Sequence, residues 1–219
     1  MTDGIVLIDK PDGMTSFGVV ARVRRVLSQQ AGKKVKVGHT GTLDPFATGL
    51  LILCVGKETK NAMSYTKLDK VYEATIRLGQ ISTTGDPEGE ISDASDVRPA
   101  SQEIEQILER FKGEITQRPP IFSAIKIGGR RAYDLARQGK DVEIPERTIT
   151  IQSLDLVSYS YPELKIRTHV SSGTYIRTLA VDIGEALGTG AYCTQLRRTK
   201  VADWDVAKAQ TLADFGVHD

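Results

Sequence analysis

The segment Gly38–Gly49 (GHTGTLDPFATG) sets one carboxylate, Asp44, among three glycines and three threonines. This composition is too rich in small residues to be explained by packing. This loop, with Asp44, is therefore the first candidate for chemistry. The other interpretation is a tight Asp-Pro turn, in which Asp44 caps the backbone and Pro45 fixes φ. A phosphate-binding loop is excluded, because Gly56-Lys57 is followed by Glu58 rather than Ser or Thr.

Arg177 and Tyr72 are the next candidates. Arg177 falls in the first turn of a predicted helix, where its charge opposes the helix dipole. A sequence that accepts this cost can need the guanidinium for a carboxylate or a phosphate, although an exposed arginine is the commoner case. Tyr72 lies in a predicted strand, where an aromatic residue usually packs on the surface of the sheet. Nothing local distinguishes it from Tyr65 or Tyr133.

Basic and aromatic residues are interleaved between Gln117 and Lys140, within an insertion whose limits are about 115–145. Before Lys140, which ends this stretch, the basic residues are Arg118, Lys126, Arg130, Arg131 and Arg137, and the aromatic ones are Phe122 and Tyr133. This mixture suits contact with a phosphate backbone together with base stacking, as RNA recognition uses. The alternative is an amphipathic excursion that packs on the domain. Residues 1–60 and 111–150 carry net charges of +4 and +3, so the near-neutral total hides two basic blocks.

Several classes of protein are disfavoured by composition. Cys54 and Cys193 are far apart and form no CxxC pair, which argues against a disulfide framework and a zinc site. The three histidines form no cluster, so no metal site is expected. No apolar run approaches the roughly 18 residues that a membrane span needs. The first ten residues do not read as a signal peptide, and we expect a cytoplasmic protein.

Hydrophobic periodicity gives the elements that must position these residues. Strands are predicted over residues 4–9, 50–55, 70–78, 148–157, 164–170, 191–199 and 203–206. Helices are predicted from Thr15 or Ser16 to about Leu27, over Ser101–Lys112, from a cap at Thr174 through Leu187, and after a cap at Thr211. The acidic stretch Gln80–Ala100 reads as a long surface excursion. Strands and helices without a βαβ rhythm favour an α+β fold with a mixed or antiparallel central sheet, flanked by helices and long loops. We predict a single domain over residues 1–219.

Taken together, these segments resemble the TruB family of bacterial tRNA pseudouridine synthases. The matching stretches occur in family order and cover the chain from about Gly4 to Leu212. They are GIVLIDKP with Gly13 and Thr15-Ser16, GHTGTLDP with Ala47-Thr48-Gly49, Lys70-Val71-Tyr72, Arg77-Leu78-Gly79, Pro119-Pro120 with Ser123-Ala124 and Lys126, and Gly173-Thr174-Tyr175-Ile176-Arg177-Thr178-Leu179.

The resemblance implies a role for each matching residue. Asp44 corresponds to the catalytic aspartate, and Tyr72 to a tyrosine that contacts the target base and is a candidate for proton transfer at C5. Arg177 corresponds to an arginine that pairs with the catalytic carboxylate. RNA or base contacts are implied for His39, which corresponds to a histidine that fills the stack left by the flipped base, and for Tyr175, near the pocket. Lys10 matches a motif that supports the active-site loop. The interleaved segment suggests RNA contacts by Lys126, Arg130 and Arg131.

The implied reaction isomerises uridine 55, in the T loop of tRNA, to pseudouridine. It breaks the N1–C1′ bond, turns the base and joins C5 to C1′, so it requires no cofactor and no metal. The expected partner is the T arm of tRNA, bound by a monomer. Two alternatives are a non-catalytic module that binds and remodels tRNA with the same surface, and a relative that acts on RNA within a guide-RNA complex.

Two departures from the family pattern accompany this resemblance. Ser172 stands where many members have lysine, which affects one possible phosphate contact. Many members also continue into a small C-terminal RNA-binding (PUA) domain, which we do not expect in this chain.

Overall fold

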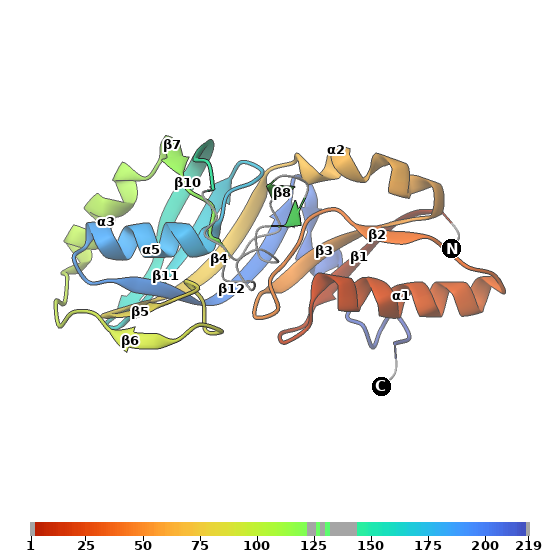
Figure 1. Cartoon of the computed structure of the whole chain (residues 1–219), viewed down its shortest axis with the longest axis horizontal. Coiled ribbons are helices and arrows are strands. Elements are labelled where there is room, and N and C mark those ends of the chain that lie inside the picture. The colour runs from red at the N-terminus through yellow and green to blue at the C-terminus, as the bar shows by residue number, and fades with distance from the viewer. Residues whose placement is uncertain (1–2, 122–125, 128–129, 132–143, 218–219) are drawn as a thin grey trace. The chain divides into compact units, whose positions relative to one another are not determined.

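A computed structural model describes residues 3–121, 126–127, 130–131 and 144–217, with only the backbone described at 126–127 and 130–131 (Figure 1). The chain forms two compact units. Unit 1 comprises Met1–Glu73 with Gln195–Asp219, and unit 2 comprises Ala74–Thr194. The strands β4 (Lys70–Leu78) and β12 (Ala191–Val201) each contribute residues to both units.

Unit 1 is built on strands in the order β1-β3-β12-β4. β1 (Gly4–Lys10) pairs with β3 (Thr48–Val55) in the antiparallel sense, whereas β3 pairs with β12 in the parallel sense. The remaining elements are β2 (Val37–His39), which pairs with β3, β13 (Trp204–Asp205), which pairs with β12, the helices α1 (Ser16–Ala31) and α2 (Ala62–Thr66), and the 3-10 helices η1 (Gly56–Asn61) and η2 (Val206–Lys208).

Local sequence accounts for α1 and for β3. The side chain of Thr15 caps α1 by accepting a hydrogen bond from the Gly18 amide at 3.0 Å. The helix ends where Gly32 adopts a φ of 63°. The inward stripe of α1 comprises Val19, Val20, Val23 and Leu27. β3 is buried from Gly49 to Val55, as its continuous apolar sequence requires.

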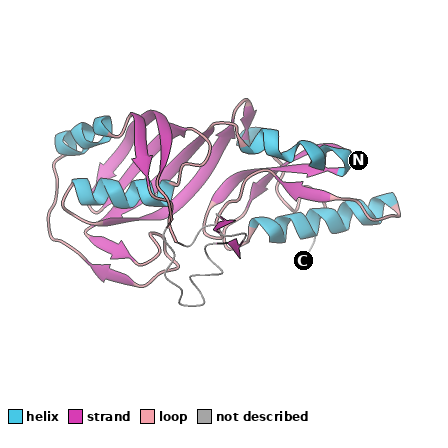
Figure 2. Cartoon of the chain, turned by 45° about the horizontal axis from the view of Figure 1, so that its top comes forward, coloured by secondary structure: helices cyan, strands magenta, loops and turns pink. Residues whose placement is uncertain are grey.

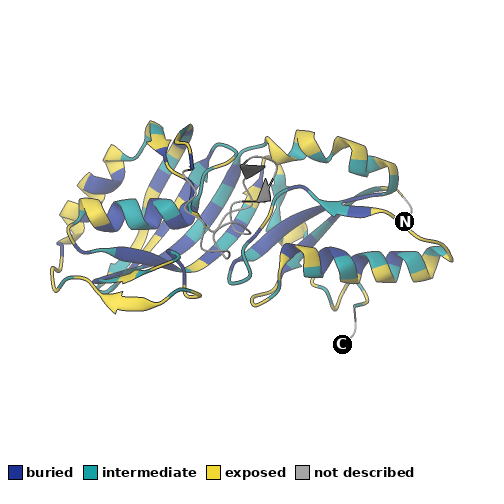
Figure 3. Cartoon of the chain, in the orientation of Figure 1, coloured by how far each residue is buried: buried dark blue, intermediate teal, exposed yellow. Residues whose placement is uncertain are grey.

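Unit 2 orders its strands β12-β4-β11-β10-β7. β11 (Glu163–Val170), β10 (Arg147–Ser160) and β7 (Gly113–Gln117) pair in the antiparallel sense, and α3 (Ser101–Arg110) packs against β10 and α5 (Ile176–Ala186). Figure 2 shows these helices beside the strands. Two small hairpins are also present among the described residues of this unit: β5 (Gln80–Ser82) with β6 (Ile91–Asp93), and β8 (Lys126–Ile127) with β9 (Arg130–Arg131). Figure 3 shows β6 exposed, in contrast to the buried positions of β11.

The predicted fold class is confirmed: a mixed sheet carries flanking helices and long loops. The strand predicted over residues 70–78 has those limits, and the free cysteines are both buried. The helix predicted after Thr211 is wrong, because residues 212–216 form turns. The excursion Gln80–Ala100 contains the β5–β6 hairpin and a buried aspartate, Asp86. Among the described residues, no helix combines the length and the apolar character needed to cross a membrane.

Candidate active site

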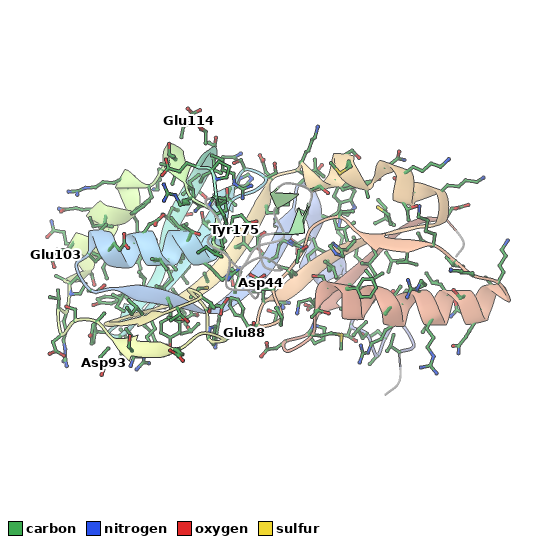
Figure 4. The ribbon with its side chains drawn as sticks, viewed as in Figure 1. Asp44, Glu88, Asp93, Glu103, Glu114 and Tyr175 are labelled. Atoms are coloured by element: carbon green, nitrogen blue, oxygen red, sulfur yellow. The ribbon has the colours of Figure 1, made fainter. Side chains whose placement is uncertain are left out.

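Asp44 lies in the loop between β2 and β3, labelled in Figure 4. We call residues 38–49, which add the end of β2 and the start of β3 to this connection, the Asp44 loop. The Asp44 carbonyl accepts a hydrogen bond from the Ala47 amide at 3.1 Å, which closes a turn with Pro45 in its second position. Leu43 and Ala47, on either side of this turn, are buried. The Asp-Pro turn predicted as one interpretation is therefore present. It uses the main chain of Asp44, and so it is compatible with chemistry at the carboxylate.

Two side chains from outside the Asp44 loop hold this turn in place. The ammonium of Lys10, at 0% exposure, donates to the carbonyls of Pro45 at 3.0 Å, Pro11 at 2.8 Å and Met14 at 2.5 Å. The hydroxyl of Ser16 accepts from the Leu43 amide at 2.8 Å and lies 2.9 Å from the Leu43 carbonyl, to which it donates. Both side chains bind the main chain of residues adjacent to Asp44.

Burial changes the acid–base behaviour of Lys10. Loss of hydration lowers the pKa of the Lys10 ammonium to about 8, and the negative charges of Asp12 and Asp44 act in the opposite direction. The Asp44 carboxylate therefore interacts electrostatically with the Lys10 ammonium. The ammonium supplies three N–H donors for three carbonyls, which matches the donor count of the protonated form.

Tyr72 and His39 belong to the same unit as Asp44. Tyr72 is 8% exposed in β4. His39 is partly buried at the end of β2, opposite Leu53 of β3. The next residue, Thr40, anchors the start of the Asp44 loop: its amide donates to the Ile52 carbonyl at 3.1 Å, and its carbonyl accepts from the Thr66 hydroxyl at 2.7 Å.

Arg177, in unit 2, forms a buried ion pair. Its guanidinium donates to the Asp86 carboxylate at 2.8 Å and to the Thr84 carbonyl at 3.1 Å. The side chains of Arg177 and Asp86 are 4% and 5% exposed, so the common case of an exposed arginine is wrong here. Asp86 is itself fixed by the Thr84 hydroxyl at 2.6 Å and the Glu88 amide at 3.0 Å. Burying a charged pair costs desolvation free energy. The hydrogen bonds that Arg177 and Asp86 make with each other and with their neighbours offset this cost.

Tyr175 precedes α5 and is held by three contacts within unit 2. Its amide donates to the side-chain oxygen of Gln117 at 2.8 Å, and its carbonyl accepts from the amide nitrogen of the same side chain at 3.0 Å. The Arg147 guanidinium lies 4.8 Å from the centre of the Tyr175 ring. Arg147 also donates to the Gly173 carbonyl. The Tyr175 ring is therefore stacked against a fixed cation beside the segment that leads to Arg177.

The basic residues of the inserted segment are described in part. Lys126 pairs with Arg131 in the register of the β8–β9 hairpin. The side chains of Lys126, Arg130 and Arg131 lie outside the described atoms, and Phe122, Tyr133 and Arg137 lie outside the described residues altogether.

Four residues to which the sequence patterns gave no role at the site contribute to these arrangements, namely Ser16, Asp86, Arg147 and Arg198, the last of which donates to the Gly41 carbonyl at 3.2 Å. One of them had a visible signal. Thr84-Gly85-Asp86-Pro87 repeats the pattern of Thr42-Leu43-Asp44-Pro45, a threonine two residues before an Asp-Pro pair. The other three bind a main-chain carbonyl, a main-chain amide or a ring that is distant in sequence. No local sequence pattern predicts such a partner.

Solved structures share this fold. A chain in the crystal structure of a Cbf5-Nop10-Gar1 complex matches 96% of this chain and is itself covered over 53% of its length, with a TM-score of 0.73 and 31% identity. A chain in an archaeal box H/ACA sRNP Nop10-Cbf5 complex gives a TM-score of 0.70 and 28% identity, covering 97% of this chain and 52% of that one. The chain thus spans about half the length of these proteins.

Sequence comparisons give the family. Residues 24–176 match the model described as TruB family pseudouridylate synthase (N terminal domain), and residues 177–217 match that described as tRNA pseudouridylate synthase B C-terminal domain. A protein named tRNA pseudouridine synthase B from Azoarcus sp. (strain BH72) is 46% identical over 97% of this chain and 69% of its own length. One of the same name from Burkholderia mallei (strain NCTC 10247) is 48% identical over 96% of this chain and 68% of its length. The chain therefore belongs to the TruB family of pseudouridylate synthases, as its motifs indicated.

Proposed function

We propose that the chain converts a uridine in the T loop of tRNA, position 55, to pseudouridine, with Asp44 as the catalytic carboxylate. The observation that carries this proposal is how Asp44 is presented. Lys10 and Ser16 hold the main chain on either side of it, through the Pro45 carbonyl and through the amide and carbonyl of Leu43. Similar proteins are named tRNA pseudouridine synthase B, and a structure with the same fold, 28% identical and with a TM-score of 0.69, is titled as bound to a substrate RNA containing 2'-deoxyuridine.

The reaction rearranges bonds within one nucleotide. The N1–C1′ bond breaks, the base turns, a C5–C1′ bond forms, and the proton leaves C5 while N1 gains one. An ionised Asp44 can serve this sequence in two ways: by attacking C1′ to give a ribosyl ester, or by taking part in the formation of a glycal. Both routes need the carboxylate within reach of the sugar, which a loop fixed by main-chain contacts provides.

The remaining residues support the same proposal. Tyr72 contacts the target base and takes part in proton transfer at C5, and Arg177 supports the catalytic carboxylate. The uridine leaves its stack at a cost of a few kcal/mol, and His39 fills the place that it leaves. Lys126, Arg130, Arg131 and Tyr175 contact the RNA around the site. Both units belong to one catalytic domain in this proposal, since β4 and β12 supply residues to each.

The test is pseudouridine formation in an unmodified tRNA transcript, mapped to the nucleotide, for the parent chain and for Asp44→Ala and Asp44→Asn. We expect modification at the T-loop uridine with the parent and no turnover with either variant. Affinity for tRNA should stay within about tenfold, because phosphate contacts dominate binding. The exposed Asp96 gives a matched control, Asp96→Asn, which should behave as the parent.

Two outcomes would change the assignment. Loss of binding together with turnover in the Asp44 variants would make Asp44 a structural turn residue. Binding of tRNA by the parent without any product would favour a module that binds and remodels tRNA.

A further inference from the structure

Arg198 is a buried cation beneath the Asp44 loop. It lies on β12 and is 2% exposed. Its Nε donates to the Leu50 carbonyl at 2.7 Å, Nη2 donates to the Gly41 carbonyl at 3.2 Å, and Nη1 lies 3.5 Å from the Thr42 carbonyl. One planar guanidinium therefore binds carbonyls on both sides of Asp44, those of Gly41 and Thr42 before it and that of Leu50 after it. Gly41 and Thr42 come shortly before Asp44, and Leu50 directly follows the loop.

The backbone of Arg198 is fixed against the same loop. Gly49 lies opposite Arg198 in the parallel pairing of β3 with β12. Gly49 has a φ of +100°, and a Cβ placed on it would come within 2.3 Å of the Arg198 carbonyl oxygen. Main chain and side chain of Arg198 thus meet the loop at separate points. The guanidinium has little freedom to follow if the loop moves.

We propose that Arg198 is a positioning residue, which sets the place of the Asp44 carboxylate by binding the carbonyls of Gly41 and Thr42. The inference rests on the proposed function of Asp44. Lys10 holds the other side of the turn through the Pro45 carbonyl. Each flank of Asp44 is therefore bonded to a buried cation. A rigid fork of N–H groups suits this task better than an ammonium, since it reaches several acceptors without rearranging.

Removal of this support has a consequence for the rate. Without the guanidinium, the buried Leu50 carbonyl loses its donor, and the carbonyls of Gly41 and Thr42 lose the bonds that tie this stretch to β12, so the chain before Asp44 can shift. Displacement of a reacting group by about 1 Å can cost on the order of a hundredfold in rate. Binding of tRNA should change little, because it depends on phosphate contacts at the surface.

The preceding residue supplies a matched control. Arg197 has the same charge and the same strand. Its guanidinium instead binds the Asp9 carboxylate at 2.7 and 3.0 Å and donates to the Thr48 hydroxyl at 3.4 Å, and its side chain is 39% exposed. Arg197→Met removes an equal charge and an ion pair without touching the carbonyls of Gly41 and Thr42.

The experiment compares the parent with Arg198→Met, Arg198→Lys and Arg197→Met by three measurements on the full chain. These are the single-turnover rate of pseudouridine formation in a tRNA transcript, the tRNA dissociation constant, and amide hydrogen exchange of the peptide that covers residues 38–49. We expect Arg198→Met to lower the rate by about a hundredfold, to keep the dissociation constant within about threefold, and to speed exchange in that peptide. Arg198→Lys should recover part of the rate, and Arg197→Met should match the parent in all three.

The possible results separate the inference from the proposed function. Equal rates for Arg198→Met and Arg197→Met, or unchanged exchange over residues 38–49, would overturn the inference. A parent chain without product, combined with faster exchange in Arg198→Met, would refute the proposed function and leave the loop support standing. Should Arg198→Met fail to fold, Arg198→Lys decides: a lower rate with a parent-like melting temperature supports the inference, and a parent-like rate overturns it.

Discussion

At the scale of single residues, buried cationic side chains hold the main chain of loops in place. Lys10 and Arg198 bind carbonyls around Asp44, and Lys70 donates to the Thr66 carbonyl at 2.6 Å. Arg177 differs from these three cations in that it binds a carboxylate, that of Asp86. Carbonyl dipoles carry no net charge, so a cation bound to them keeps most of its field. Such cations favour an anionic group near them, which fits the catalytic role proposed for the Asp44 carboxylate.

Asp182 on α5 offers a test of buried charge by pH. Burial raises the pKa of its carboxyl to about 6, and the nearby Glu185 adds to this effect. The folded chain therefore holds a proton between about pH 4 and 6 that the unfolded chain releases, and the free energy of unfolding falls as pH rises through this window.

Asp182→Asn removes that titration. We expect its stability, relative to the parent, to increase by at most about 1.4 kcal/mol per pH unit from about pH 4 to 6, and then to level off. Urea unfolding at a series of pH values measures this difference, with the exposed Asp96→Asn as control. A difference between Asp182→Asn and the parent that stays constant across the series would contradict the assignment.

At the scale of elements, local signals predicted what local physics decides. The apolar runs of β1 and β3, the alternation of β4, and the stripe of α3 each predict a strand or helix without reference to the rest of the chain. The end of α1 was predicted too early, because its last turn is polar and Gly32 is the signal that stops it. The helix after Thr211 failed for a related reason. Thr211 does accept a hydrogen bond from the Asp214 amide at 3.1 Å, but the cap opens only a short series of turns.

The residues of the candidate site likewise differ in whether a local sequence signal points to them. Asp44 could be selected because its loop is unusual in composition, and Arg177 because of its place in a helix. His39 has no local signal, and Tyr72, although a candidate, is not distinguished locally from other tyrosines, so their roles came only from resemblance to a family. Arg198 looked like one of several strand residues, since its partners lie up to 157 positions away in the chain. Contacts of that span depend on tertiary packing, which periodicity does not encode.

Gly49 allows a test of the junction between the Asp44 loop and β3. Gly49→Ala places a Cβ at a positive φ and against the Arg198 carbonyl, so we expect the free energy of unfolding to fall by at least about 2 kcal/mol. Gly38→Ala is the matched control in the same loop. A Cβ at Gly38 would meet no atom within 4 Å, and its expected effect is under about 1 kcal/mol. Chemical denaturation of both variants gives the comparison, and equal decreases would show that the close approach at Gly49 does not limit substitution.

At the scale of the whole molecule, charge is segregated along the chain. The segment from Gly13 to Leu43 has six basic residues and no acidic one, whereas residues 61–110 have 5 basic and 10 acidic residues. A net charge of +1 thus gives little idea of the local field. A polyanion such as RNA experiences the basic segments rather than the average, so its binding should depend strongly on salt.

Arg130 and Arg131 test the part of this field that lies in the inserted segment. The double variant Arg130→Gln, Arg131→Gln should weaken tRNA binding and reduce the slope of log affinity against log salt by about 0.7 to 0.9 for each phosphate that is no longer neutralised. Filter binding over a range of salt concentrations provides the slope. The exposed pair Arg98→Gln, Arg110→Gln removes the same charge from the acidic region, and its slope should stay near that of the parent. An unchanged slope for the Arg130, Arg131 variant would remove the inserted segment from the RNA interface.

The division of unit 1 between the first 73 residues and the last 25 has a consequence for synthesis on the ribosome. Translation delivers the Asp44 loop early, but Arg198 on β12 comes 157 residues after Gly41. A nascent chain therefore carries its carboxylate on a loop that lacks half of its support until β12 has left the exit tunnel. Incomplete chains can expose the motif without the geometry, and the order of translation itself delays maturation of the loop until β12 has been made.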